Sequence, residues 1–205
     1  FGADYAPPGM LWGKVLRAPH AHARILRIET GKARALPGVH AVVTGADFPD
    51  FPDEYAGPER LQKNLHHDVR NVMAREKVYY HGQPVAAVAA RDAATAKAAL
   101  DLIEVTYEVL PHVVTIDEAI APGAPLVHEG MTTRNVEPPV PSNITRRWET
   151  TLGDPAKGFS AADEIVELSF DTAPVHQGYI EPHACVAEYN ADGTAHLWVS
   201  SQGAF

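Results

Sequence analysis

The most constraining feature of this sequence is a strand, a helix and a strand in direct succession between residues 84 and 110. The run from Val85 to Ala90 is short, apolar and rich in small or β-branched residues, which indicates a buried strand. Asp92 is a good N-cap, and it precedes apolar residues at helical spacing, namely Ala96, Ala99, Leu100 and Ile103. Val105 to Val109 returns to strand character. This order predicts a mixed α/β layer within an α+β fold.

The rest of the first half predicts further short elements between Pro and Gly residues. The expected strands are Leu11 to Leu16, Ala23 to Ile28, Val39 to Thr44 and Val78 to Tyr80. A short helix from Thr30 to Ala35 must end at Pro37-Gly38, because proline lacks a backbone donor and disfavours helix before it. Asp47 to Arg70 shows no hydrophobic period, which predicts a long surface loop.

Prolines at 122, 125, 138, 139 and 141 interrupt the hydrophobic pattern and predict a connector. We therefore expect one domain over residues 1–120, a linker over 121–142 and a second domain over 143–205. In the second domain, Asp154-Pro155 has the pattern of a helix start, with a cap followed by proline at the first position. The remaining expected elements are strands at Ile144 to Thr150 and Glu164 to Phe170, and a hairpin of Cys185 to Tyr189 with Ala195 to Ser200.

Charge and composition exclude several partner classes. The chain has 205 residues and a net charge of -9, and its basic residues do not gather in one stretch, so we do not expect nucleic acid as a partner. The longest apolar run is far shorter than the roughly 18 residues of a membrane span, and the first residues lack a signal-peptide pattern. Cys185 cannot form an internal disulfide, since it is the only cysteine, and we expect a cytoplasmic protein.

Eleven histidines raise the question of a metal site. Zinc needs three or four convergent ligands in characteristic spacings, and the sequence has none of these motifs. The candidate pairs are only His20 with His22, His66 with His67, and His183 with Cys185. We therefore predict no metal ligated by side chains of this chain, and we expect His20 and His22 to bracket a turn and to hydrogen-bond locally.

Other catalytic patterns are equally sparse. Ser160 only half matches a nucleophile elbow and lies in a helical context, and no glycine-rich phosphate loop is present. Cys185 begins an apolar strand, which favours a buried structural thiol over a reactive one. Glu181 and His183 precede that strand, and they could either carry chemistry or tie down a loop. The residues by themselves predict a two-domain α/β chain without a complete active site.

Several ordered blocks resemble the large subunit of the xanthine dehydrogenase and aldehyde oxidase family, the molybdenum hydroxylases. Resemblance to the a/b hammerhead domain rests on Pro8 to Gly13, Leu16 to Ile25, Ala35 to Val39, Tyr80 to Val88 and Val105 to Pro111. Resemblance to the start of the molybdopterin-binding domain rests on Gly153-Asp154, Phe159, Ala162-Asp163, Glu181 to His183 and Trp198 to Gly203.

The resemblance implies hydroxylation of an aldehyde, an N-heterocycle or a related substrate, with water as the oxygen source. It implies a molybdenum-molybdopterin cofactor, which Gln202 and Gly203 would contact, and no side chain on the metal. Gln202 is the one catalytic residue it suggests, because its amide can donate a hydrogen bond near the oxygen ligand of the metal.

Electrons would leave through 2Fe-2S clusters and FAD on partner domains or subunits. The glycine-rich cofactor loops and the general-base glutamate of the family are expected beyond Phe205, so this chain alone would be an incomplete catalyst. The alternative is a docking module that keeps the hammerhead fold and binds no cofactor.

Overall fold

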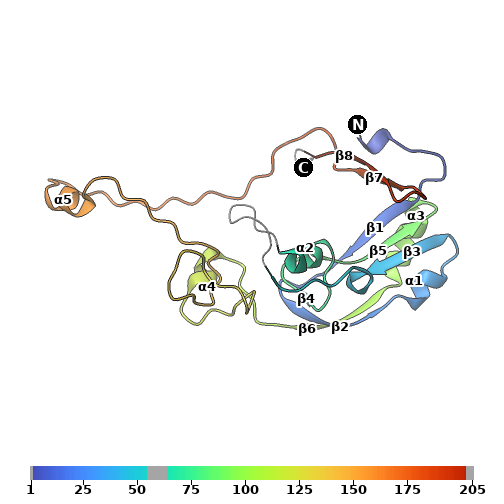
Figure 1. The fold of residues 1–205 in the computed structure, drawn as a ribbon, viewed down its shortest axis with the longest axis horizontal. Helices are drawn as coiled ribbons and strands as arrows, with labels where there is room; N and C mark the ends of the chain where they lie inside the picture. Colours follow the sequence, from blue (N-terminus) through green and yellow to red (C-terminus); the bar gives the residue numbers. More distant parts are fainter. Residues whose placement is uncertain (1, 55–63, 202–205) are drawn as a thin grey trace. The chain divides into compact units, whose positions relative to one another are not determined.

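The computed structural model describes residues 2–54 and 64–201 (Figure 1). Contacts divide the chain into two compact units. The sheet unit is Leu11–Trp148, and the hairpin unit is Phe1–Met10 together with Glu149–Phe205. Residues 121–142 thus make their contacts within the sheet unit, and their role as a domain linker remains a prediction.

The first sheet of the sheet unit has the strand order β1-β5-β3, and both pairings are antiparallel. Its strands are β1 (Trp12–Arg17), β5 (Pro84–Ala90) and β3 (Val39–Thr44). Helices α3 (Ala93–Asp101) and α1 (Gly31–Ala35) pack against it, and their apolar side chains complete a core with those of β5 and β3. The predicted strand, helix and strand are confirmed, and Asp92 caps α3 by accepting a hydrogen bond from the Thr95 amide at 2.7 Å.

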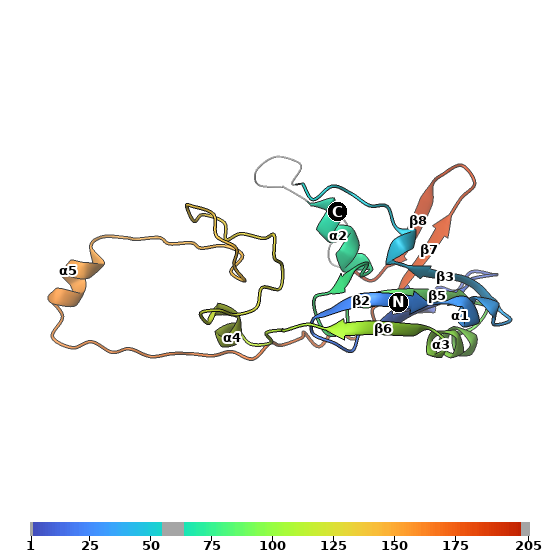
Figure 2. The same cartoon turned by 90° about the horizontal axis from the view of Figure 1, so that it is seen from below.

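The second sheet has the strand order β4-β2-β6. Its central strand β2 (Ala23–Glu29) is antiparallel to both β4 (Lys77–Val78) and β6 (Glu104–Val109), and Figure 2 shows β6 running beside β2. A second core cluster fills this region, and Leu16 and Val105 pack against both clusters. The two sheets are therefore joined by shared apolar packing. The strand expected at Val78 to Tyr80 is shorter than predicted.

The segment predicted as a long loop contains a helix, α2 (Leu65–Val72). Asn64 caps it by accepting a hydrogen bond from the His66 amide at 3.1 Å. Its one buried residue is Arg70, which pairs with Glu76 at 2.9 Å and with Asp50 at 3.1 Å. Its apolar residues Leu65, Val69 and Val72 do recur at helical spacing, but they extend over a helix of only 8 residues and follow a segment rich in Pro, Asp and Glu, so the period is too short to stand out. The loop expectation for residues 65–70 was wrong for that reason.

Gln83 is a fully buried polar residue that connects α2 with the region after β4. Its amide nitrogen donates to the Arg70 carbonyl at 2.8 Å, and its amide oxygen accepts from the Tyr79 backbone at 2.7 Å. These bonds give both the nitrogen and the oxygen of the buried amide a hydrogen-bond partner. Gln83 therefore fixes α2 against the turn that leads into β5.

The end of the sheet unit is held by side-chain bonds to the backbone more than by regular structure. Helix α4 (Ile116–Ile120) starts at Thr115 in a capping box. Asn143 donates to the carbonyls of Ala119 and Pro125, each at 3.0 Å, and so closes the segment on itself. The strand predicted at Ile144 to Thr150 does not form among the described residues, where Arg146 makes only an isolated bridge with Arg134.

The hairpin unit contains η1 (Gly2–Asp4), α5 (Pro155–Ser160) and a two-stranded sheet of β7 (Cys185–Tyr189) and β8 (Ala195–Val199). The predicted hairpin and the predicted helix start are confirmed, since Asp154 caps α5 by accepting from the Lys157 amide at 2.9 Å. Glu164 to Phe170 is not a strand and has no pairing strand among the residues described. That prediction was wrong for the chain as it stands.

Candidate functional site

Glu181 organises the base of the hairpin. Its carboxylate accepts hydrogen bonds from the Gly2 amide at 2.8 Å and from the Ser200 hydroxyl at 3.0 Å. These two bonds lower the pKa of Glu181. The Ser200 amide also donates to the Ala184 carbonyl at 3.0 Å, so the chain is fixed where β8 ends. Of the two interpretations of Glu181, these contacts support the one in which it ties down a loop.

Gln202 and Gly203, the residues expected at the cofactor, lie outside the described residues. The structure describes the residues just before them, namely strand β8 and Ser200, which is held by its hydrogen bond to Glu181. No described residue of the hairpin unit is buried. The described part of this unit therefore presents an open surface.

The nucleophile candidates are both on the surface. Cys185 is exposed, so the expectation of a buried core thiol was wrong, because nothing among the described residues covers this face of the hairpin. Ser160 is the last residue of α5, and its hydroxyl donates to the Lys157 carbonyl at 3.0 Å. His183 packs edge to face against Tyr179, with ring centroids 4.6 Å apart. The structure does not bring a base and a nucleophile together at any of these positions.

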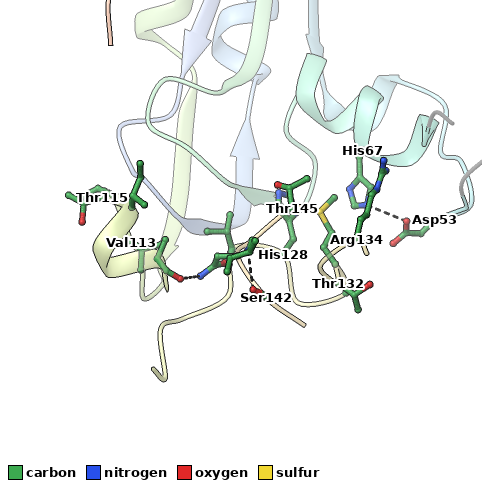
Figure 3. Close-up of a pocket in the computed structure, with 17 residues that line it drawn as sticks. Asp53, His67, Val113, Thr115, His128, Thr132, Arg134, Ser142 and Thr145 are labelled. Atoms are coloured by element: carbon green, nitrogen blue, oxygen red, sulfur yellow. Dashed lines mark hydrogen bonds and ion pairs between the residues drawn. The ribbon is translucent and has the colours of Figure 1, made fainter. Parts of the chain in front are cut away.

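The sheet unit contains a hollow of about 680 Å³ between α4, the segment that follows it and His67 of α2 (Figure 3). One wall is apolar and includes Val114, Ile116 and Ile144, all with exposed side chains. At the other end, His67 Nε2 lies 3.2 Å from the Asp53 carboxylate, a contact drawn as a dashed line in Figure 3. No sequence pattern predicts this hollow, because most of its lining comes from irregular segments on either side of α4.

The histidine pairs have structural contacts. His20 and His22 do lie between β1 and β2, but the bond of His22 is not local, since its Nδ1 contacts the Pro111 carbonyl at 2.9 Å. His66 Nδ1 contacts the Phe51 carbonyl at 2.9 Å. Within residues 2–54 and 64–201, no group of three or more His, Cys, Asp or Glu side chains could hold a metal ion. In the same residues, no helix is long and apolar enough to cross a membrane.

Comparison with protein-family models assigns most of the chain to two known domains. A family model described as aldehyde oxidase and xanthine dehydrogenase, a/b hammerhead domain, matches residues 1–111, which is more than half of the chain. The chain belongs to this family. A second model, described as the molybdopterin cofactor-binding domain, matches residues 136–205. The predicted family and fold class are confirmed.

Individual members of this family are similar in sequence to nearly the whole chain. The carbon monoxide dehydrogenase large chain of Afipia carboxidovorans is 37% identical over 97% of this chain and 24% of its own length. The xanthine dehydrogenase molybdenum-binding subunit of Escherichia coli O157:H7 is 30% identical over 97% of this chain and 25% of its own length. The chain therefore spans about a quarter of the length of these relatives.

Solved structures agree with the fold described above. The crystal structure of quinoline 2-oxidoreductase from Pseudomonas putida 86 matches with a TM-score of 0.80 and 28% identity, over 98% of this chain and 24% of that one. Aldehyde oxidoreductase from Desulfovibrio gigas matches with a TM-score of 0.70 and 25% identity, over 96% of this chain and 21% of that one.

Proposed function

We propose that this chain is part of the catalytic subunit of a molybdenum hydroxylase, an oxidoreductase that hydroxylates its substrate with oxygen taken from water. The observation that carries the proposal is the match of both family models in the order hammerhead domain, then molybdopterin-binding domain. Relatives are named for carbon monoxide, xanthine and nicotinate, so the substrate is a small molecule of this range.

The described residues do not by themselves fit a molybdopterin cofactor. A buried ligand commonly has about 70–90% of its surface covered. No described residue of the hairpin unit is buried, so this unit offers at most one wall of such a site. No catalytic step is therefore assigned to residues of this chain through the cofactor.

Within the proposal, Gln202 and Gly203 form the part of the wall that contacts the cofactor. Their support is the resemblance of Trp198 to Gly203 to the family and the fixed position of Ser200 just before them. The iron-sulfur clusters and FAD belong to other domains or subunits, in keeping with relatives named as large chains or molybdenum-binding subunits. A cytoplasmic location remains a prediction.

Isotope labelling of the assembled protein, isolated under native conditions, tests the proposed reaction. The protein is incubated in ¹⁸O-water with an electron acceptor and, separately, with carbon monoxide, xanthine, nicotinate and an aromatic aldehyde. We expect one of these to be oxidised, with the new oxygen carrying the label. Turnover with unlabelled oxygen, or no turnover of any of the four, would contradict the proposal. Heat-denatured protein is the control for uncatalysed exchange.

A further inference from the structure

Five aromatic rings lie in series within the sheet unit. They come from the connection between β1 and β2, from the residue after β4, from the segment after α4, and from α2. In order, the rings are those of His22, Tyr79, His128, His67 and His66. His128 lies between residues 111 and 136, in the part of the chain that neither family model matches.

The Tyr79 ring stacks with two imidazoles. Its ring centroid is 5.9 Å from that of His22 and 4.3 Å from that of His128, with interplanar angles of 25° and 23°. The edge contact of His67 with His128 has centroids 5.7 Å apart. These contacts attach the residues around His128 to β4 on one side and to α2 on the other.

His22 is fixed at the buried end of the series. Its Nδ1 donates to the Pro111 carbonyl at 2.9 Å, because a carbonyl oxygen only accepts. Its Nε2 is buried and has no hydrogen-bond partner among the described residues, and the residue as a whole is 5% exposed.

Positive groups surround His128 on its other sides. Lys77 of β4 forms an ion pair with Glu129 at 3.2 Å, and His67 Nε2 of α2 lies 3.2 Å from the Asp53 carboxylate. Both carboxylates are more than half exposed, at 76% and 57%, so water weakens their compensating effect.

Burial, followed by the nearby His67, His22 and Lys77, lowers the pKa of His128 from its usual 6.5. The aromatic face of Tyr79 stabilises a protonated His128 and so acts in the opposite direction, but this is one contact against the four effects that lower the pKa. His66, the last ring, contacts His67 and the Phe51 carbonyl and does not reach His128 directly.

We propose that this ring series is a proton-sensitive latch. It holds residues 127–131 against β4 and α2 while His128 is neutral, and it releases them when His128 takes up a proton.

The direction of the pH effect follows from the lowered pKa of His128 in the latched form. Above the usual value of 6.5 both forms are neutral and the latch is closed. As the pH falls below that value, the released form binds the proton more readily, so the stability of the latch is progressively lost. Two backbone amides can report on opening of the latch. The Val127 amide donates to the Asn143 side chain at 2.9 Å, and the Met131 amide donates to the His128 carbonyl at 3.2 Å.

Amide hydrogen exchange on the full 205-residue chain at pH 7.5 and 5.5 tests the latch. After correction for the intrinsic pH dependence of exchange, opening at residues 127–131 should increase by up to about tenfold at pH 5.5, as expected for one coupled proton. Amides of β5 should not change and serve as the internal reference.

His128→Phe keeps a ring on Tyr79 but cannot titrate, so the pH dependence should disappear. His128→Gln, a second variant that does not titrate, must give the same result, and circular dichroism checks that both are folded. His40→Gln changes an exposed histidine outside the series and should behave as the wild type. An equal opening of the wild type at both pH values, or a tenfold effect that persists in both His128 variants, would overturn the proposal.

Discussion

Gly45 begins the short helix η2 (Gly45–Asp47) at a point where two stretches of backbone nearly touch. A Cβ atom on this residue would lie 2.3 Å from the Ala74 carbonyl oxygen and 2.8 Å from the Arg75 Cα atom. Real Cβ atoms do not approach backbone so closely, and backbone cannot rotate away as a side chain can. The contact therefore requires glycine for its size.

Gly45→Ala should lower the free energy of unfolding by about 1–3 kcal/mol, the usual cost of overpacking. Gly31→Ala is the matched control, because no atom lies within 4 Å of its Cβ position and it stands in α1, where alanine is favoured by up to about 1 kcal/mol. Urea denaturation followed by circular dichroism measures both. Equal effects of the two substitutions would show that the close approach is not a constraint.

Gln202 is the residue that the family resemblance suggests would contact the proposed cofactor. In the assembled full-length enzyme, Gln202→Ala should lower turnover by about 10–100-fold, the usual range for loss of a group that orients a metal site through its ligands. Gln202→Glu should be worse, because an ionised carboxylate cannot donate a hydrogen bond. Steady-state rates, with molybdenum content measured in parallel, check this. Wild-type rates in both variants at full molybdenum content would remove Gln202 from the site.

Single buried polar residues were the least predictable part of the fold. Gln83 reads as a turn residue, and its neighbours in sequence do not indicate that Arg70 and Tyr79 will surround it. His22 likewise gives no sequence sign of its contact with Pro111, which is 89 residues away. Such contacts depend on the tertiary arrangement, whereas the N-caps Asp92 and Asp154 depend only on residues nearby and were predicted correctly.

Elements were predictable where their partners lie within the same unit. Strand β5 and helix α3 cover each other's apolar faces, so their periodicity matches their structure. Helix α2 was missed because it is short: its apolar spacing consists of Leu65, Val69 and Val72 alone, beside a buried Arg70. Glu164 to Phe170 has strand character in sequence, yet Val166, Leu168 and Phe170 are 79%, 69% and 83% exposed. Their alternation indicates one apolar face of a strand that lacks a pairing partner here.

We therefore expect Glu164 to Phe170 to become a strand in the assembled full-length protein. Amide hydrogen exchange over this segment should be fast in the 205-residue chain and slowed by at least about 100-fold in the assembly, since amides in a buried sheet exchange only on opening. The amides of α3 should be protected in both samples and provide the reference. Fast exchange of the segment in both would refute the strand assignment.

The two units differ in how much buried core each of them contains. The sheet unit has two apolar clusters and a buried polar network, whereas no described residue of the hairpin unit is buried. Sequence resemblance identified the family of this chain, and the structure adds that the hairpin unit, in its described residues, is an open surface. A cofactor that needs an enclosed site cannot be retained by such a surface alone.

The most direct test of the account is the molybdenum and pterin content of two samples. The full-length assembly isolated without denaturation should contain stoichiometric molybdenum and show pterin fluorescence after cofactor release. The purified 205-residue chain should contain neither. Absence of molybdenum and pterin from the assembly would contradict the account and would favour a docking module that keeps the hammerhead fold without a cofactor.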